Sequence, residues 1–126
     1  AHDGLDEISL SGPTTVFSCL IKGGVVKKTI FSPGDVGMAT APLSAIIGGD
    51  AKENAVLLKR VLDNEPGPRR DIVVLNAGHA LLAAGRADSL ENGMAQAQDS
   101  LASGRAGAVL GQLVAVSQQA KSLEAN

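Results

Sequence analysis

The 126-residue sequence predicts a mixed α and β fold in which a β-hairpin precedes four helices. Three observations predict it. Two β-rich stretches flank a pair of glycines in the first part of the chain, and capping signals followed by apolar residues at helical spacing fill the rest. Aromatic residues make up only 2% of the chain against 44% apolar residues, so any core is built from Val, Ile, Leu and Ala. The length suits one domain with a single core.

The hairpin is predicted from Thr14 to Ile21 and from Val25 to Phe31. Lys22-Gly23-Gly24 separates the two stretches, and Gly-Gly favours a tight turn because glycine adopts positive φ at little cost. Ser32-Pro33-Gly34-Asp35 then predicts a turn, since proline removes a ladder donor, and loop is expected up to residue 42. Because an isolated two-stranded hairpin is marginal in water, further strands are expected outside this chain.

The first helix is predicted from Ala51 to Asp63. Asp50 can cap it, and Glu53 completes an Asp-x-x-Glu capping box. A rigid connector with two prolines follows. The stretch from Arg69 to Ala84 is apolar on nearly every side and is closed by Gly85. Its β-branched residues are typical of a strand, but about sixteen residues is the length of a helix, so a buried helix is predicted.

Two further helices complete the chain. Asp88 and Glu91 form a second predicted capping box, and the helix after it should end at Gly104. One face of this helix carries Leu90, Met94, Ala97 and Leu101. The last helix is predicted to turn an inner stripe toward the core, made of Ala106, Val109, Leu110, Leu113 and Val116, with Gln112, Gln118 and Gln119 facing outward.

Composition and charge argue against several classes of partner. The net charge is −2, without the clustered Lys and Arg that a nucleic-acid partner requires. The apolar run Ile72–Leu75 is far shorter than the roughly 20 residues of a membrane helix. The single cysteine, Cys19, cannot form an internal disulfide, and no secretory signal is visible. We therefore expect a soluble protein in a reducing, cytoplasmic setting, with neither nucleic acid nor membrane as a partner. An acidic motif within the first seven residues of a chain that lacks an initial methionine suggests a fragment.

Three carboxylates near the start of the chain are the strongest candidates for chemistry. Asp3, Asp6 and Glu7 fall within five positions, in a segment without helical or strand periodicity. Mg²⁺ prefers hard oxygen ligands and is usually held by one or two carboxylates plus substrate phosphates. Asp6 and Glu7 suffice for such a half-site if a loop lets adjacent side chains converge. The simpler alternative is that these are solvated charges near a chain end.

The other candidate residues have simpler structural interpretations. Gly48-Gly49-Asp50 resembles a phosphate cradle, but a turn and an N-cap explain every residue. Cys19 is expected to be a small buried hydrophobe in a strand. His79, on the apolar helix, is more typical of a core or edge residue than of a base. Two further candidates are weak: His2, and the pair Arg69-Arg70, which is most simply a solvated rim although phosphate binding stays open.

Several motifs, in order along nearly the whole chain, resemble the anthranilate phosphoribosyltransferase family. They are His2-Asp3-Gly4-Leu5-Asp6-Glu7-Ile8-Ser9, Gly12-Pro13-Thr14, Asp35-x-Gly37, Gly48-Gly49-Asp50-x-x-Glu53-Asn54-Ala55 and Asn76-Ala77. Departures from residues common in the family lie in the hairpin and the turn after it, at Ser18, Cys19, Gly34 and Val36.

The resemblance implies a fold and a reaction. The fold is the α/β class of the anthranilate phosphoribosyltransferase and nucleoside phosphorylase enzymes, with residues 1–126 supplying the carboxyl-terminal part of the α/β domain. The enzyme is a glycosyltransferase of tryptophan biosynthesis that moves phosphoribosyl from phosphoribosyl pyrophosphate to anthranilate. Carried over, the family's Mg²⁺ ligands fall on Asp6 and Glu7. Both substrates would be bound mostly by the missing upstream part, the parent enzyme would be a homodimer, and the fragment alone would be inactive.

Two alternatives from other classes stay open. A pyrimidine nucleoside phosphorylase shares this fold, but phosphorolysis lacks the metal-pyrophosphate requirement that the Asp6-Glu7 pair answers. A non-catalytic nucleic-acid-binding paralogue would need a basic groove, which the net charge of −2 does not indicate in this chain.

Overall fold

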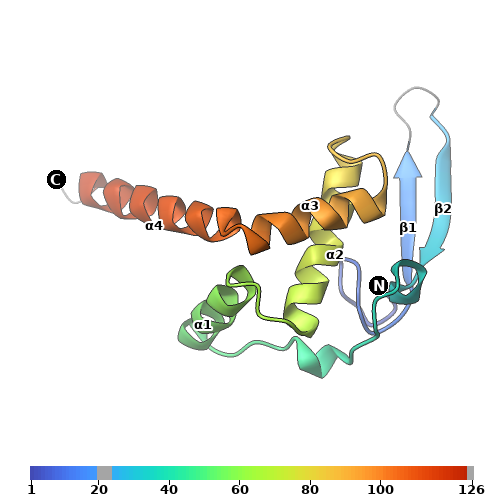
Figure 1. Ribbon diagram of the computed structural model, residues 1–126, viewed down its shortest axis with the longest axis horizontal. Helices are drawn as coiled ribbons and strands as arrows, with labels where there is room; N and C mark the ends of the chain where they lie inside the picture. The colour runs from blue at the N-terminus through green and yellow to red at the C-terminus, as the bar shows by residue number, and fades with distance from the viewer. Residues whose placement is uncertain (20–23, 125–126) are drawn as a thin grey trace.

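The computed structural model describes residues 1–19 and 24–124, without the side chains of 122–124. Its strands and helices are, in order, β1 (Thr14–Cys19), β2 (Val26–Phe31), α1 (Ala51–Leu62), α2 (Pro68–Ala83), α3 (Leu90–Ala102) and α4 (Arg105–Glu124). Two short 3₁₀ helices, Pro33–Val36 and Leu43–Ala45, lie between β2 and α1. Figure 1 shows α2 at the centre, with the hairpin on one side of it and α1 and α4 on the other. The predicted hairpin followed by four helices is confirmed.

The hairpin is antiparallel, with Thr14 opposite Phe31 and Cys19 opposite Val26. Gly24 has a φ of +62°, the left-handed conformation that the predicted turn requires. The rest of that turn, Lys22 and Gly23, and the end of the predicted first strand, Leu20 and Ile21, lie outside the described residues.

The two faces of the hairpin differ in burial. On one face Thr14 is 3% exposed, and Phe31 packs against the core. On the other face Phe17 is 65% exposed and Ile30 69% exposed. Cys19 shares this open face and is exposed. The predicted burial of Cys19 is therefore wrong, because nothing in the described part of the chain covers the face of β1 that carries it.

Local capping signals account for the starts of α1 and α3. The Asp50 carboxylate accepts from the backbone N–H groups of Lys52 and Glu53, and Glu53 accepts from the Asp50 N–H, so the predicted capping box is confirmed. The box predicted for Asp88 and Glu91 is wrong. Ser89 holds the extended N-cap conformation one residue later, and its hydroxyl accepts from the Asn92 N–H at 3.2 Å.

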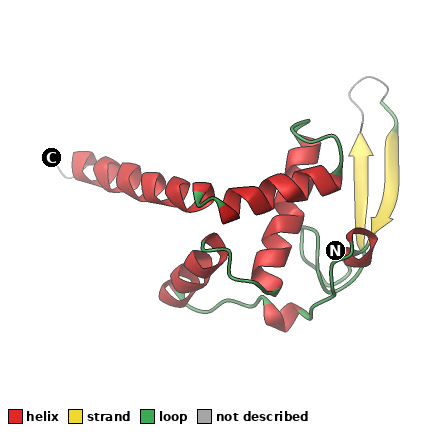
Figure 2. Cartoon of the chain, viewed as in Figure 1, coloured by secondary structure: helices red, strands yellow, loops and turns green. Residues whose placement is uncertain are grey.

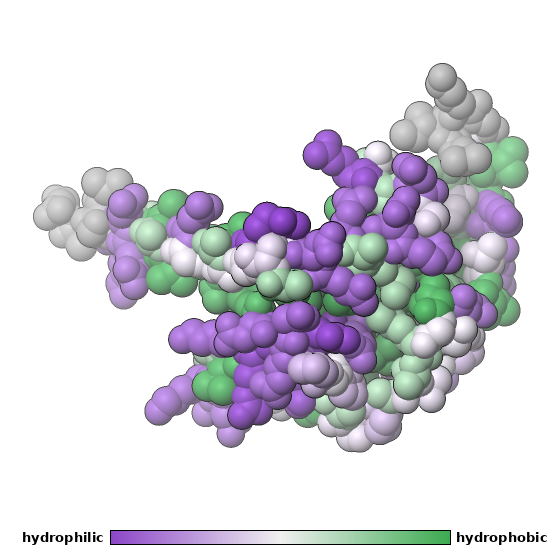
Figure 3. Space-filling view, in the orientation of Figure 1, coloured by the Kyte–Doolittle hydropathy of each residue, from purple (hydrophilic) through white to green (hydrophobic). Residues whose placement is uncertain are grey.

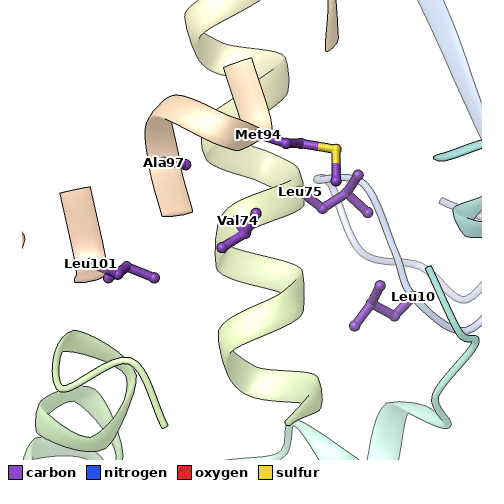
Figure 4. Close-up of a cluster of buried hydrophobic side chains, with 6 residues drawn as sticks. All are labelled: Leu10, Val74, Leu75, Met94, Ala97 and Leu101. Atoms are coloured by element: carbon purple, nitrogen blue, oxygen red, sulfur yellow. The ribbon is translucent and has the colours of Figure 1, made fainter. Parts of the chain in front are cut away.

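The core lies where α2 crosses α3 and meets the loop before β1. Its buried apolar cluster is Leu10, Val74, Leu75, Met94, Ala97 and Leu101 (Figure 4). The crossing depends on two glycines, because a Cβ on Gly93 would lie 2.5 Å from the backbone oxygen of Gly78. Figure 2 shows that the chain from the N-terminus to β1 is loop, and it runs beside α2. The core therefore fixes Leu10 and the loop that leads to it.

Apolar periodicity overestimated the burial of two helices. In α2 the residues Val74 and Leu75 are buried, but Val73 is 43% exposed, so the helix is covered on one side only. In α4 the predicted inner stripe is wrong beyond its first turns, since Val109 and Leu113 are 62% and 63% exposed. The helix projects from the body (Figures 1 and 3). Among the described residues, none of the helices combines the length and the apolar character needed to span a membrane.

Candidate metal centre

The candidate site lies in the loop of residues 1–13, which has neither helical nor strand geometry. The loop geometry predicted for the carboxylates is thus present. Gly4 has a φ of +91°, a conformation that side chains rarely adopt. This turn brings the backbone N–H of Leu5 to the Asp3 carboxylate at 3.2 Å. The loop therefore folds back on itself immediately before Asp6 and Glu7.

Asp3 is bound within the loop. Its Oδ2 atom accepts hydrogen bonds from the hydroxyls of Ser11 and Ser9, the latter at 2.5 Å. The two hydroxyls, that of Ser11 first, hold the pKa of the Asp3 carboxyl well below its usual range. Ser9 is 1% exposed, so this network also joins the loop to the core. Asp3 therefore braces the loop, a structural role that sets its carboxylate apart from those of Asp6 and Glu7.

Asn76 of α2 fixes the residue that follows the acidic pair. Its Oδ1 accepts from the Ile8 N–H, and its Nδ2 donates to the Ile8 carbonyl, both at 2.9 Å. Nδ2 also donates to the Ile72 carbonyl one helical turn earlier. Sequence reasoning quoted Asn76 only as part of a motif and assigned it no role. The available signal was an amide in an apolar helix, which needs partners when it is partly buried.

Asp6 and Glu7 are exposed, and in the described part of the chain neither carboxylate takes part in a hydrogen bond or an ion pair. They lie between the Asp3 network and the Ile8 anchor. No cluster of three or more His, Cys, Asp or Glu that could hold a metal occurs among the described residues. Two hard oxygen donors fit a Mg²⁺ ion whose remaining ligands are water and substrate phosphate. The residues present therefore fit half of such a site.

Two of the three backbone N–H groups in the Gly48-Gly49-Asp50 segment already have acceptors within the chain. Asn54 Oδ1 accepts from the Gly49 N–H at 2.9 Å, and Glu53 accepts from the Asp50 N–H at 3.1 Å. A Cβ on Gly49 would lie 1.7 Å from Glu53 Oε2, so glycine leaves room for this capping group. The structural interpretation of the motif accounts for each residue.

The remaining candidates also have structural partners. The Nδ1 of His79 lies 3.0 Å from the Leu75 carbonyl, and its ring meets Phe31 edge to face at 4.8 Å between centroids. Arg69 donates to the Ile47 carbonyl, and Arg70 pairs with Asp71 at 2.8 Å. The exposed His2 has its ring against Gly12. None of these side chains is brought toward Asp6 and Glu7 by a described contact.

Comparison with known proteins decides the family. Residues 1–107 match the model of the glycosyl transferase family, a/b domain. The chain belongs to this family. It is 48% identical, over 94% of its length, to an anthranilate phosphoribosyltransferase of Rhodopseudomonas palustris strain HaA2. It therefore carries part of an α/β domain, and the predicted fold class and resemblance are confirmed.

Two solved structures of family members share the fold. The crystal structure of an anthranilate phosphoribosyltransferase from Thermus thermophilus superposes with a TM-score of 0.78 and 40% identity, covering 90% of this chain and 33% of that one. The enzyme from Saccharomyces cerevisiae, solved with 4-fluoroanthranilate, gives a TM-score of 0.68 and 29% identity, covering 82% of this chain and 30% of that one. The chain spans about one third of the length of the curated relatives it matches.

Proposed function

We propose that this chain is the carboxyl-terminal part of the α/β domain of an anthranilate phosphoribosyltransferase, and that Asp6 and Glu7 hold its Mg²⁺. The observation that carries the proposal is the adjacent pair of exposed, unpartnered carboxylates on a loop that is braced on both sides. Relatives of that name, at up to 48% identity over nearly the whole chain, support it. The full-length protein transfers phosphoribosyl from phosphoribosyl pyrophosphate to the amino nitrogen of anthranilate and releases pyrophosphate.

The residues of this chain bind and orient rather than transfer protons. Asp6 and Glu7 present adjacent carboxylate oxygens, and Asp3 and Asn76 hold the backbone on either side of them. When bound, Mg²⁺ supplies positive charge that neutralises the departing pyrophosphate. A preformed loop loses little conformational freedom on binding, which strengthens the interaction with the ion.

The rest of the longer protein supplies what these residues lack. It carries a helical amino-terminal domain and the first part of the sheet, binds most of anthranilate and the phosphoribosyl donor, and forms the homodimer. The protein works in the cytoplasm, and the fragment alone is inactive. Among the described residues the sheet has only two strands, so each has an edge without a strand partner, and this supports a sheet that continues outside this chain. The exposed apolar face of the hairpin, with Phe17 and Ile30, supports a further layer that covers it.

The test follows the loss of anthranilate fluorescence with phosphoribosyl pyrophosphate and Mg²⁺. Three samples are compared: the full-length protein, its Asp6→Ala/Glu7→Ala variant and the 126-residue chain. We expect turnover by the unmodified full-length protein alone. Turnover by the short chain would contradict the division of the site between this chain and the rest. Undiminished turnover and Mg²⁺ dependence in the double variant would remove the metal assignment.

The same assay also decides whether the two alternative functions need to be tested. Should the full-length protein show no turnover, phosphorolysis of a pyrimidine nucleoside and binding to nucleic acid are the next measurements. Activity in either would replace the proposed reaction.

A further inference from the structure

We propose that Asn76 is a positioning residue for the metal pair, acting through the backbone of Ile8. This inference rests on the proposed function, because it assigns a role toward the ion that Asp6 and Glu7 would hold. Asn76 lies in α2, and a separation of 68 residues divides it from Ile8 in sequence. It neither is a ligand nor touches the substrate; it acts on the loop that carries the ligands.

The geometry of the contact supports an orienting role. The amide of Asn76 engages both the N–H and the C=O of Ile8 at 2.9 Å, which fixes the two peptide groups that flank Ile8, including the one that joins it to Glu7. Nδ2 also bonds the Ile72 carbonyl, so the amide itself cannot rotate freely. Two hydrogen bonds from α2 to Ile8, with a third that holds the amide on α2 itself, therefore set where the loop leaves Glu7.

On the same side of the pair the Ser9 N–H also donates to the Thr14 hydroxyl, and Ile8 packs against the core, but among the described residues only Asn76 bonds the backbone of Ile8 itself. Asp3, Ser9 and Ser11 hold the loop to itself, whereas no described hydrogen bond involves the backbone of Asp6 or Glu7. Without Asn76 the N–H and the C=O of Ile8 both lose their partners. The adjacent carboxylates would then sample orientations that do not converge on one ion, and this costs metal affinity.

A second asparagine provides a matched control. Asn54 makes the same pair of bonds with Gly49, accepting from its N–H and donating to its C=O, each at 2.9 Å. That loop contains neither of the proposed metal ligands, Asp6 and Glu7. Truncating Asn54 therefore removes an equivalent backbone clamp from the same protein without touching the metal loop.

The experiment measures Mn²⁺ binding by electron paramagnetic resonance, with pyrophosphate present, in the full-length protein. We expect Asn76→Ala to weaken binding roughly 10-fold to 100-fold, the usual range when a residue that orients a metal ligand is lost. Asn54→Ala should stay within about twofold of the unmodified protein. In the fluorescence assay Asn76→Ala should raise the apparent KM for Mg²⁺, with most of kcat recovered at saturating Mg²⁺.

Asn76→Gln serves if Asn76→Ala does not fold. It keeps both amide groups but displaces them by one methylene, so it should weaken Mn²⁺ binding more than Asn54→Gln does. Equal effects at the two asparagines would overturn the positioning role. An Asp6→Ala control separates this failure from that of the proposed function. If Asp6→Ala leaves Mn²⁺ binding unchanged, the proposed metal site itself is wrong. If Asp6→Ala abolishes Mn²⁺ binding while the Asn76 variants bind normally, only the positioning role of Asn76 is wrong.

Discussion

Two loops of this protein have the composition of ligand-binding motifs, and the structure separates them. The loop of residues 1–13 contains Asp3, Asp6 and Glu7, and the loop that ends in Gly48-Gly49-Asp50 combines glycines with an acid. An asparagine side chain clamps the backbone of each loop with a donor and an acceptor. They differ in which polar groups remain without a partner.

In the loop that ends in Gly48-Gly49-Asp50, the polar side chains bond to residues close by in sequence. Asp50 caps α1, Glu53 bonds back to Asp50, and Asn54 bonds Gly49. Of the three carboxylates in the first loop, only that of Asp3 is hydrogen-bonded within the loop. Those of Asp6 and Glu7 remain exposed. A motif can serve a ligand only with groups that the fold has not already used. The first loop retains two whole carboxylates of this kind, whereas in the Gly48-Gly49-Asp50 loop the acid caps α1 and two of the backbone N–H groups have acceptors.

The largest expected difference comes from the same substitution in both loops. Asp6→Asn removes a charged ligand oxygen and should lower Mg²⁺-dependent turnover on the order of 100-fold, since electrostatic groups at a reacting centre typically contribute that much. Asp50→Asn keeps an equally good N-cap and should change stability by less than about 0.5 kcal/mol, with normal turnover. Turnover and urea unfolding of both full-length variants measure this. Similar losses of activity at the two positions would erase the distinction between the loops.

A smaller effect should follow from filling the space beside Gly49. A Cβ there would lie 1.7 Å from Glu53 Oε2 and 3.2 Å from Glu53 Cβ, so Gly49→Ala must break the capping box. We expect a loss of about 1 to 2 kcal/mol in the free energy of unfolding, with unchanged Mg²⁺ dependence. Gly34→Ala is the control, because its Cβ would meet nothing within 4 Å. Altered Mg²⁺ dependence in Gly49→Ala would mean that this loop contributes to the metal site after all.

Local signals in the sequence predicted the elements well. The capping box of Asp50 and Glu53 and the glycine at position 24 act over a few residues, so the sequence displays both partners at once. Asp6 and Glu7 could be recognised as a pair for the same reason, because they are adjacent in the sequence. Where a cap had a competitor next to it, as with Asp88 and Ser89, the prediction was wrong by one residue.

Contacts between distant residues were beyond such reasoning. Asn76 and Ile8 are 68 residues apart, so no spacing links them. The exposed Val109 and Leu113 of α4 and the exposed Cys19 of β1 were expected to be covered. Periodicity shows that a helix or strand has an apolar face, but it does not show which segment covers that face. In the described ranges of this chain, no segment does.

The smallest expected effect concerns the acid response of the first loop. The hydroxyls of Ser11 and Ser9 lower the pKa of Asp3 below its ordinary value of 3.8. A carboxyl whose pKa is lower in the folded state stabilises the protein fully above the unfolded value, and the contribution falls as the pH drops toward the folded value. The stability difference between the full-length protein and its Asp3→Asn variant, measured by urea unfolding, should therefore be constant above about pH 5 and shrink below pH 3.8. A difference that stayed constant down to about pH 3, or grew, would show that the two serines do not stabilise the ionised Asp3, and the brace assigned to the first loop would fail with it.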